Sequence, residues 1–108
     1  MIFHITTSAV WEAARASGTY RGDSLENEGF IHCSTAQQVA GVANAVFGGV
    51  EGLVVLHIDE SRLASPVMYE NLEGGEEFFP HVYGSINSEA VAQVTALAAG
   101  PNGEFAFG

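Results

Sequence analysis

Hydrophobic and polar residues alternate in several short stretches of the chain, and a period of two residues is typical of β-strands. Residues 1–6, MIFHIT, place Phe3 and Ile5 on one face and His4 on the other. The segment 53–59, LVVLHID, is almost continuously apolar, which favours a central strand buried on both faces. Further short strands are expected at GFIHCS (29–34), VMYE (67–70), FFPHVYG (78–84) and Val91–Leu97.

Two stretches have the pattern of amphipathic helices. AVWEAARAS (9–17) follows two cap candidates and ends before Gly18. Thr35 and Gln38 form a T-x-x-Q capping box, which predicts a helix that runs from there to about Phe47. The intervening TYRGDSLENEG (19–29) is polar and is expected to be a loop. Two early helices and several later strands predict an α+β fold with a mixed, mainly antiparallel sheet.

Composition and charge narrow the class of protein. A chain of 108 residues with 47% hydrophobic and 15% charged residues is expected to form one domain over 1–108. It has 13 acidic residues, three arginines and no lysine, for a net charge of −10, which argues against general nucleic-acid binding. A small phosphorylated ligand stays open if arginines and backbone amides are placed locally.

The expected location follows from three features of the sequence. No apolar run approaches the roughly 20 residues that a membrane-spanning helix needs. The first residues lack the basic region and the cleavage site of a secretory signal. The chain has one cysteine, Cys33, which suits a reducing compartment. We therefore expect a cytoplasmic protein with no membrane association, whereas the oligomeric state is left open.

Three predicted strands each carry a histidine with a hydroxyl residue two positions further along. Because residues i and i+2 of a strand lie on the same face, each pair should face the same side. The pairs are His4 with Thr6, His32 with Ser34, and His81 with Tyr83. We expect these pairs to line a polar cleft. His57 has Asp59 at the same spacing, but it lies in the most apolar run and is left outside the site.

Several chemistries fit such a cleft. Imidazoles and hydroxyls can hydrogen-bond a polar organic ligand, with Tyr83 or Phe79 stacking on a flat ring and Glu70 as the nearest carboxylate for chemistry. Three neutral imidazoles could instead hold a transition metal, although no local metal-binding motif is present. The polar loop with Ser24 could close over a ligand or be solvated. Each histidine alone could equally well bond only to a neighbouring strand.

The sequence gives less support to a catalytic nucleophile at Cys33 or Ser34 than to a ligand-binding cleft. His32 cannot readily serve as a base for Cys33, because adjacent strand residues point to opposite faces, so a small buried thiol is expected. Ser34 shares a face with His32, but the strand–turn–helix elbow of serine hydrolases is absent from the sequence.

Three blocks together resemble a known family: H-I-T, E-G-F-I-H-C-S and F-P-H-V-Y-G. They are similar to the small bacterial family numbered 952 among the domains of unknown function, over about residues 2–97. The tail 98–108 and His57 lie outside the resemblance. The residues that fall on the family's motif positions are His4, Thr6, Ser24, His32, Ser34, Gln38, Glu70, His81 and Tyr83.

The resemblance implies a split antiparallel sheet similar to that of ADP-ribosyltransferases and RNA 2′-phosphotransferases, which bind NAD. It implies a site for NAD or an ADP-ribosyl nucleotide, with group transfer or hydrolysis to follow. Three arginines are few for a phosphotransferase. A non-catalytic binding module and a three-histidine metalloenzyme are the alternatives. The predicted catalytic residues are Glu70 and His32, and the predicted ligand-binding residues are His4, Thr6, Ser24, Ser34, His81 and Tyr83.

Overall fold

The strands and helices of the fold are given by a computed structural model that describes residues 1–72 and 74–107. The class is α+β, as predicted. The strands are β1 (Ile2–Thr7), β2 (Thr19–Tyr20), β3 (Ile31–His32), β4 (Leu53–Ile58), β5 (Val67–Glu70), β6 (Phe79–Val82), β7 (Ile86–Asn87) and β8 (Val91–Leu97). The α-helices are α1 (Ser8–Ser17), α2 (Gly22–Glu28) and α3 (Val39–Val46), and single 3₁₀ turns occupy Glu60–Arg62 and Ser88–Ala90.

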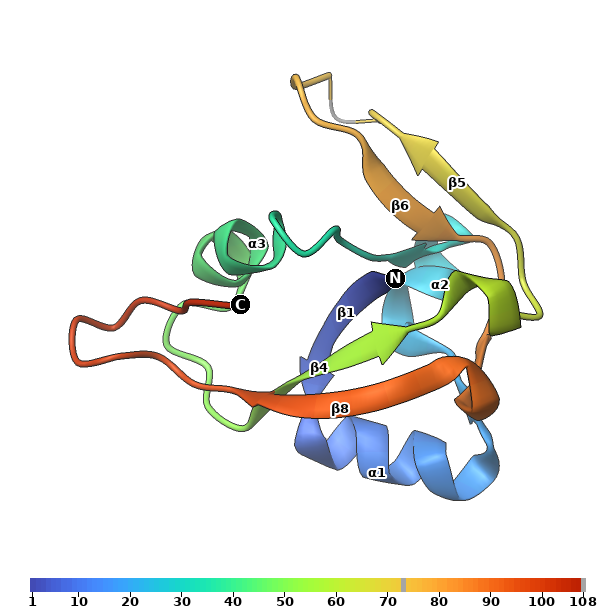
Figure 1. The fold of residues 1–108 in the computed structure, drawn as a ribbon, viewed down its shortest axis with the longest axis horizontal. Helices are drawn as coiled ribbons and strands as arrows, with labels where there is room; N and C mark the ends of the chain where they lie inside the picture. The colour runs from blue at the N-terminus through green and yellow to red at the C-terminus, as the bar shows by residue number, and fades with distance from the viewer. Residues whose placement is uncertain (73, 108) are drawn as a thin grey trace.

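The longest strands form an antiparallel sheet of order β1-β4-β8. The apolar run of β4 lies in its centre, as its sequence predicts. Leu56 and Ile58 of β4 pack in one core cluster with Trp11 of α1. Val55 packs in a second cluster with Val39 of α3. Helices α1 and α3 therefore cover opposite faces of this sheet (Figure 1).

A second antiparallel sheet, of order β3-β6-β5, carries two of the three predicted cleft histidines, His32 and His81. His32 pairs with His81, and His81 pairs with Met68, so these three side chains form a row on one face. The neighbours Ile31 and Val82 are fully buried in the core cluster of α1. The β5–β6 hairpin rises away from the β1-β4-β8 sheet (Figure 1), and a two-stranded β2-β7 sheet completes the fold.

The two sheets meet where β1 and β3 run side by side. Phe3 and Ser34 form a bridge there, with N–H···O distances of 2.9 and 2.7 Å in the two directions. This bridge brings the face of β3 that bears His32 next to β1, which bears His4. Backbone hydrogen bonds at this bridge therefore join the two sheets.

The helices differ from the sequence prediction in two places. Residues Gly22–Glu28 form α2, where a polar loop was expected, so the described residues contain three α-helices rather than two. This segment offers only Leu25 to the core, which is too little for a visible apolar period. The third helix begins at Val39, not at Thr35. The side chain of Gln38 does accept a 3.0 Å bond from the Thr35 N–H, as in a capping box, but a turn precedes the helix.

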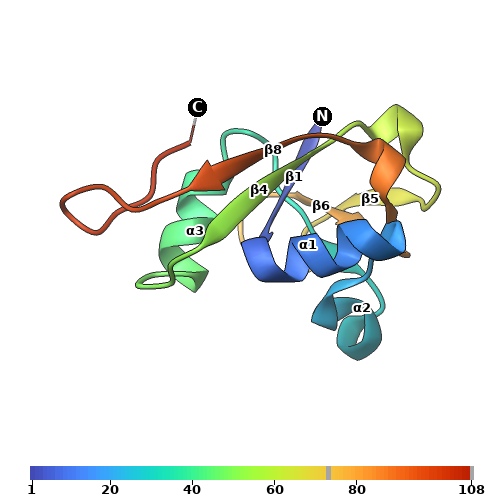
Figure 2. The ribbon, with the colours of Figure 1, turned by 90° about the horizontal axis from the view of Figure 1, so that it is seen from below.

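The tail after β8 folds back on the chain. Figure 2 shows it running out beyond the end of the β1-β4-β8 sheet and then turning back. The Asn44 side chain of α3 holds it, because its amide donates 3.1 Å to the Phe105 carbonyl and accepts 2.8 Å from the Phe105 N–H. Among the described residues, no helix combines the length and apolar character needed to cross a membrane.

Candidate functional site

A carboxylate–histidine pair joins β5 to β6. One oxygen of Glu70, Oε1, accepts a 2.9 Å bond from His81 Nδ1 and a 2.6 Å bond from the Tyr83 hydroxyl. The Tyr83 bond, and after it the His81 bond, lowers the pKa of Glu70 below its ordinary value. Glu70 therefore stays ionised at neutral pH. The sequence placed Glu70, His81 and Tyr83 in one site, and the structure brings these three together.

The second ring nitrogen of His81 is open. Because Nδ1 donates to Glu70, the neutral ring carries its lone pair on Nε2. Within residues 1–72 and 74–107, Nε2 has no hydrogen-bond partner. In the same residues no fully buried side-chain nitrogen or oxygen lacks one, so Nε2 must reach the surface, although the residue is only 4% exposed. A fixed imidazole with one open nitrogen can accept a proton or a ligand hydrogen bond.

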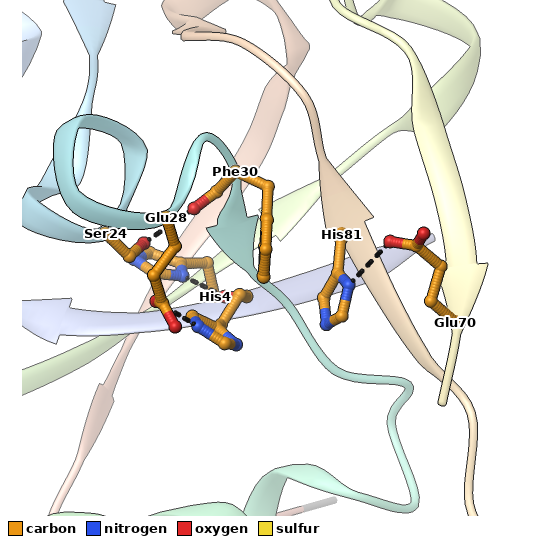
Figure 3. Close-up of polar contacts among 7 residues, drawn as sticks. His4, Ser24, Glu28, Phe30, Glu70 and His81 are labelled. Carbon is orange, nitrogen blue, oxygen red and sulfur yellow. Dashed lines mark hydrogen bonds and ion pairs between the residues drawn. The ribbon is translucent and has the colours of Figure 1, made fainter. Parts of the chain in front are cut away.

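Phe30 packs against the imidazole ring of His81. Its ring stacks on His81 with centroids 4.3 Å apart and lies 5.3 Å from the ring of Tyr83. Figure 3 shows Phe30 between His81 and the group around His4. Ser24 of α2 donates a 2.8 Å bond to the Phe30 carbonyl. Ser24 thus positions Phe30 in this structure, whereas the sequence left it as a loop residue that could close over a ligand.

His32 lies beside His81 at the exposed edge of the cluster. The ring centroids of the two histidines are 5.3 Å apart, in an edge-to-face arrangement. His32 Nε2 contacts Glu28 Oε2 at 2.7 Å. Glu28 was missed by the sequence analysis. The four-residue spacing to His32 was the available signal, but it was hidden because Glu28 belongs to a helix that the pattern did not reveal.

His4 holds the backbone of β3 next to the site. Its Nδ1 donates to the carbonyl of His32 at 2.6 Å, and its Nε2 lies 2.8 Å from the hydroxyl of Tyr20. A neutral ring with Nδ1–H accepts at Nε2, so the Tyr20 hydroxyl can donate to His4, and the Tyr20 oxygen also lies 3.2 Å from the hydroxyl of Thr6. Burial lowers the pKa of His4 to about 4, which keeps it neutral.

The network means that His4 and Thr6 do not present free groups to a ligand in the way the sequence predicted. Both ring nitrogens of His4 are used, and the only hydroxyl partner of Thr6 among the described residues is Tyr20. Tyr20 is 4% exposed and was not predicted as part of the site. A buried phenol normally finds a hydrogen-bond partner, but nothing in the sequence identifies which one.

Ser34 and Cys33 play backbone and core roles. Ser34 is buried and is held by its two backbone bonds to Phe3. No side-chain bond joins Ser34 to His32 within the described part of the chain, so the pairing of a serine with a base is not formed. Cys33 is 3% exposed, and burial raises the pKa of its thiol. This agrees with the expected buried thiol.

The described residues do not form the three-histidine metal centre that the sequence left open. They contain no group of three histidine, cysteine, aspartate or glutamate residues that could hold a metal ion. The reason is geometric, because His4 directs one nitrogen to the His32 backbone and the other to Tyr20. Of the three histidines, only His32 and His81 have their rings next to each other.

Two hollows on the surface lie away from these histidines. One, of about 460 Å³, is lined by Phe3, His57 and Phe107 among others, and His57 Nε2 there contacts the Thr95 hydroxyl at 2.9 Å. The other, of about 520 Å³, lies between α1 and β8. Neither borders the three predicted cleft histidines. At His81 the stacked ring of Phe30 fills space that the sequence assigned to a cleft, so the candidate site is a face of the β3-β6-β5 sheet.

Comparison with known proteins gives a family and a fold. Residues 5–94 match the family described as "Protein of unknown function (DUF952)". The crystal structure of protein CC0527 from Caulobacter crescentus is 29% identical, with a TM-score of 0.86 over 97% of this chain and 92% of that one. A double mutant of that protein is 28% identical over the same shares, also with a TM-score of 0.86.

The solution NMR structure of CC0527 is 30% identical, with a TM-score of 0.83 over 95% of this chain and 89% of that one. No curated protein matches this sequence.

Proposed function

The chain belongs to the family of unknown function DUF952, and from that premise we propose that it binds a small planar molecule on the face of the β3-β6-β5 sheet that carries Phe30, Glu70 and His81. The observation that carries this proposal is His81 itself. It is almost fully buried, its Nδ1 is fixed by a carboxylate, and its Nε2 has no partner among the described residues. An imidazole that is fixed at one nitrogen and open at the other can accept a hydrogen bond or a proton from a ligand.

The chemistry of the pair suits general-base catalysis or ligand orientation. Nε2 of His81 would take a hydrogen bond or a proton from the ligand. Glu70 would stabilise the imidazolium that forms, because its charge lies 2.9 Å from the other nitrogen. In this proposal His81 has the role first assigned to His32, and Glu70 keeps its role as the catalytic carboxylate. His4, Thr6 and Ser24 support the face rather than touch the ligand.

NAD or an ADP-ribosyl nucleotide is the ligand class that we propose first, with transfer or hydrolysis at the glycosidic carbon. Support comes from the family resemblance and from the aromatic surroundings of His81. Phe30 is stacked on the imidazole, Tyr83 is 38% exposed, and Met68 beside them is 53% exposed. Such a surface lets a flat ring lie against aromatic and thioether groups. The net charge of −10 favours a small ligand over a nucleic acid.

Isothermal titration with NAD, ADP-ribose and NADP at millimolar concentration tests this function. We expect binding by the wild-type protein and its loss in His81→Asn, a substitution that keeps a donor near Glu70 but removes Nε2. His57→Asn is the matched control, because His57 lies on β4 and bonds to Thr95. Absence of binding by all three nucleotides would overturn the nucleotide proposal.

A non-catalytic binding module is the second candidate. It is favoured by the fact that His81 and Tyr83 share one oxygen of Glu70, which is a rigid arrangement suited to shaping a surface. Glu70→Gln separates the two candidates. An enzyme would lose turnover of a bound nucleotide in this variant, whereas a module would show no turnover in either the wild-type protein or the variant.

A further inference from the structure

Two histidines of the candidate site, His32 and His81, are each paired with a carboxylate. Glu28 contacts His32 at 2.7 Å, and Glu70 contacts His81 at 2.9 Å. Neither carboxylate is within ion-pair distance of an arginine in the described part of the chain. The sequence has only three arginines and no lysine, and Arg15 pairs with Glu12 on α1. The two carboxylates therefore give this face a negative charge that no ion-paired arginine offsets among the described residues.

The charge of Glu70 is held by two hydrogen-bond donors, Tyr83 and His81. The hydrogen bond to Glu70 raises the pKa of the Tyr83 phenol, so Tyr83 keeps its proton. The other donor is the Nδ1–H of an imidazole that is neutral when Nε2 is open. Hydrogen bonds from neutral groups orient a carboxylate without cancelling its charge. A ligand that reaches Nε2 of His81 therefore meets an uncompensated negative charge on the far side of the ring.

Resting on the proposed function, we propose that the part of the ligand bound at this face is a planar heteroaromatic cation that carries an N–H donor and no phosphate. The N–H would bond to Nε2 of His81, and the ring would lie against Tyr83 and Met68, which are 38% and 53% exposed. The positive charge would be attracted by Glu70 and Glu28 and by the aromatic ring. In NAD this is the nicotinamide end, because its ring is cationic and its carboxamide donates.

The inference is specific about charge. A phosphate placed here would face two carboxylates, neither of which has an arginine within ion-pair distance among the described residues. Electrostatic complementarity acts mainly on selectivity, so the effect should appear as a difference between ligands that share a ring and differ in charge.

Two matched pairs of ligands test the proposal in NMR titrations of the labelled protein. 1-Methylnicotinamide and nicotinamide share the carboxamide and differ in the ring charge. Nicotinamide riboside and nicotinamide mononucleotide differ in one phosphate. We expect the cation to bind about fivefold more tightly than nicotinamide, and the riboside about fivefold more tightly than the mononucleotide. N-Methylpyridinium, which keeps the charge but lacks the N–H donor, should bind more weakly than 1-methylnicotinamide.

Variants locate the effect. Glu70→Gln should lower the affinity for 1-methylnicotinamide and leave that for nicotinamide nearly unchanged. Glu12→Gln removes an exposed carboxylate on α1 and is the matched control, with no expected effect. Equal or tighter binding of the mononucleotide would overturn the inference.

The test also separates this inference from the proposed function. If ADP-ribose binds at His81 while the nicotinamide compounds do not, the function stands and the inference fails. If no planar ligand of any charge binds, the proposed function itself fails.

Discussion

Glu70 and His81 are diagonal neighbours on adjacent strands, and their side chains meet at 2.9 Å. In the β5–β6 ladder Glu70 pairs with Phe79, and His81 pairs with Met68. The contact between Glu70 and His81 therefore joins residues that are two positions out of register. A slip of one residue would move Glu70 to the opposite face of the hairpin. The register of a short hairpin therefore creates the carboxylate–histidine pair on which the proposed function depends.

Tyr83→Phe should raise the pKa of Glu70 towards its ordinary value. The Tyr83 hydroxyl is the largest cause of the lowered pKa, and its bond to Oε1 is 2.6 Å long. Carbon-detected NMR titration of the Glu70 carboxylate measures this change. Tyr69→Phe is the matched control, because its hydroxyl bonds to Glu60 instead. A Glu70 pKa that is equally low in Tyr83→Phe would show that the hydroxyl does not stabilise the carboxylate.

Ser24→Ala should destabilise the protein by about 1 kcal/mol, the usual net value of one hydrogen bond. The bond that is lost joins α2 to the carbonyl of Phe30, next to the site. Urea unfolding monitored by Trp11 fluorescence measures the loss. A variant with unchanged stability but weakened ligand binding would instead support the loop-closure role that the sequence suggested for Ser24.

Acidification between pH 6.5 and about 5 should destabilise the protein through His4. Burial lowers the pKa of His4 from 6.5 to about 4, so the unfolded chain binds more protons than the folded one between these values. The stabilisation by neutral His4 is complete above pH 6.5 and is lost as the pH falls towards 4. Because His4 is only half-buried, we expect a total effect of at most about 2–3 kcal/mol.

The free energy of unfolding measured at several pH values tests this, with His4→Gln as the comparison. The variant should lose most of the slope between pH 6.5 and about 5. Glu70 also has a lowered pKa, but it contributes in the same direction only below its ordinary value of 4.5. An unchanged slope in His4→Gln would assign the pH dependence to other groups.

Cys33 should resist alkylation in the folded protein. It is 3% exposed, and burial raises the pKa of its thiol, so very little thiolate is present at neutral pH. Iodoacetamide labelling followed by mass spectrometry should show modification only after denaturant is added. Rapid labelling under native conditions would contradict the assigned core role.

The longer strands of this protein could be predicted from sequence because their apolar periods are strong, whereas the two-residue strands β2 and β7 were not predicted. Val91–Leu97 forms β8 as expected, and the apolar run around Val55 forms the central strand β4. Alternation also placed His81 and Tyr83 on one face, and both contact Glu70. These properties are local, because the residues of a strand themselves determine which side chains share a face.

The parts that failed depend on contacts between distant segments. His4 was expected to face a ligand, but it bonds to Tyr20, sixteen positions away, whose location only the tertiary fold determines. Helix α2 was missed because Leu25 is its only core contact. Because this helix was missed, its residue Glu28 was not predicted to be the partner of His32. The stacking of Phe30 on His81 was not predicted, because pattern alone does not say how far a ring reaches across the sheet.

The central claim is that His81 holds its proton on Nδ1 and leaves Nε2 open to a ligand. Long-range ¹H–¹⁵N spectra of the imidazoles, at a pH where the ring is neutral and with His81 assigned through His81→Asn, report this directly. The account predicts a protonated Nδ1 and an unprotonated Nε2 in the wild-type protein, with loss of this preference in Glu70→Ala. A proton on Nε2 in the wild-type protein would contradict it.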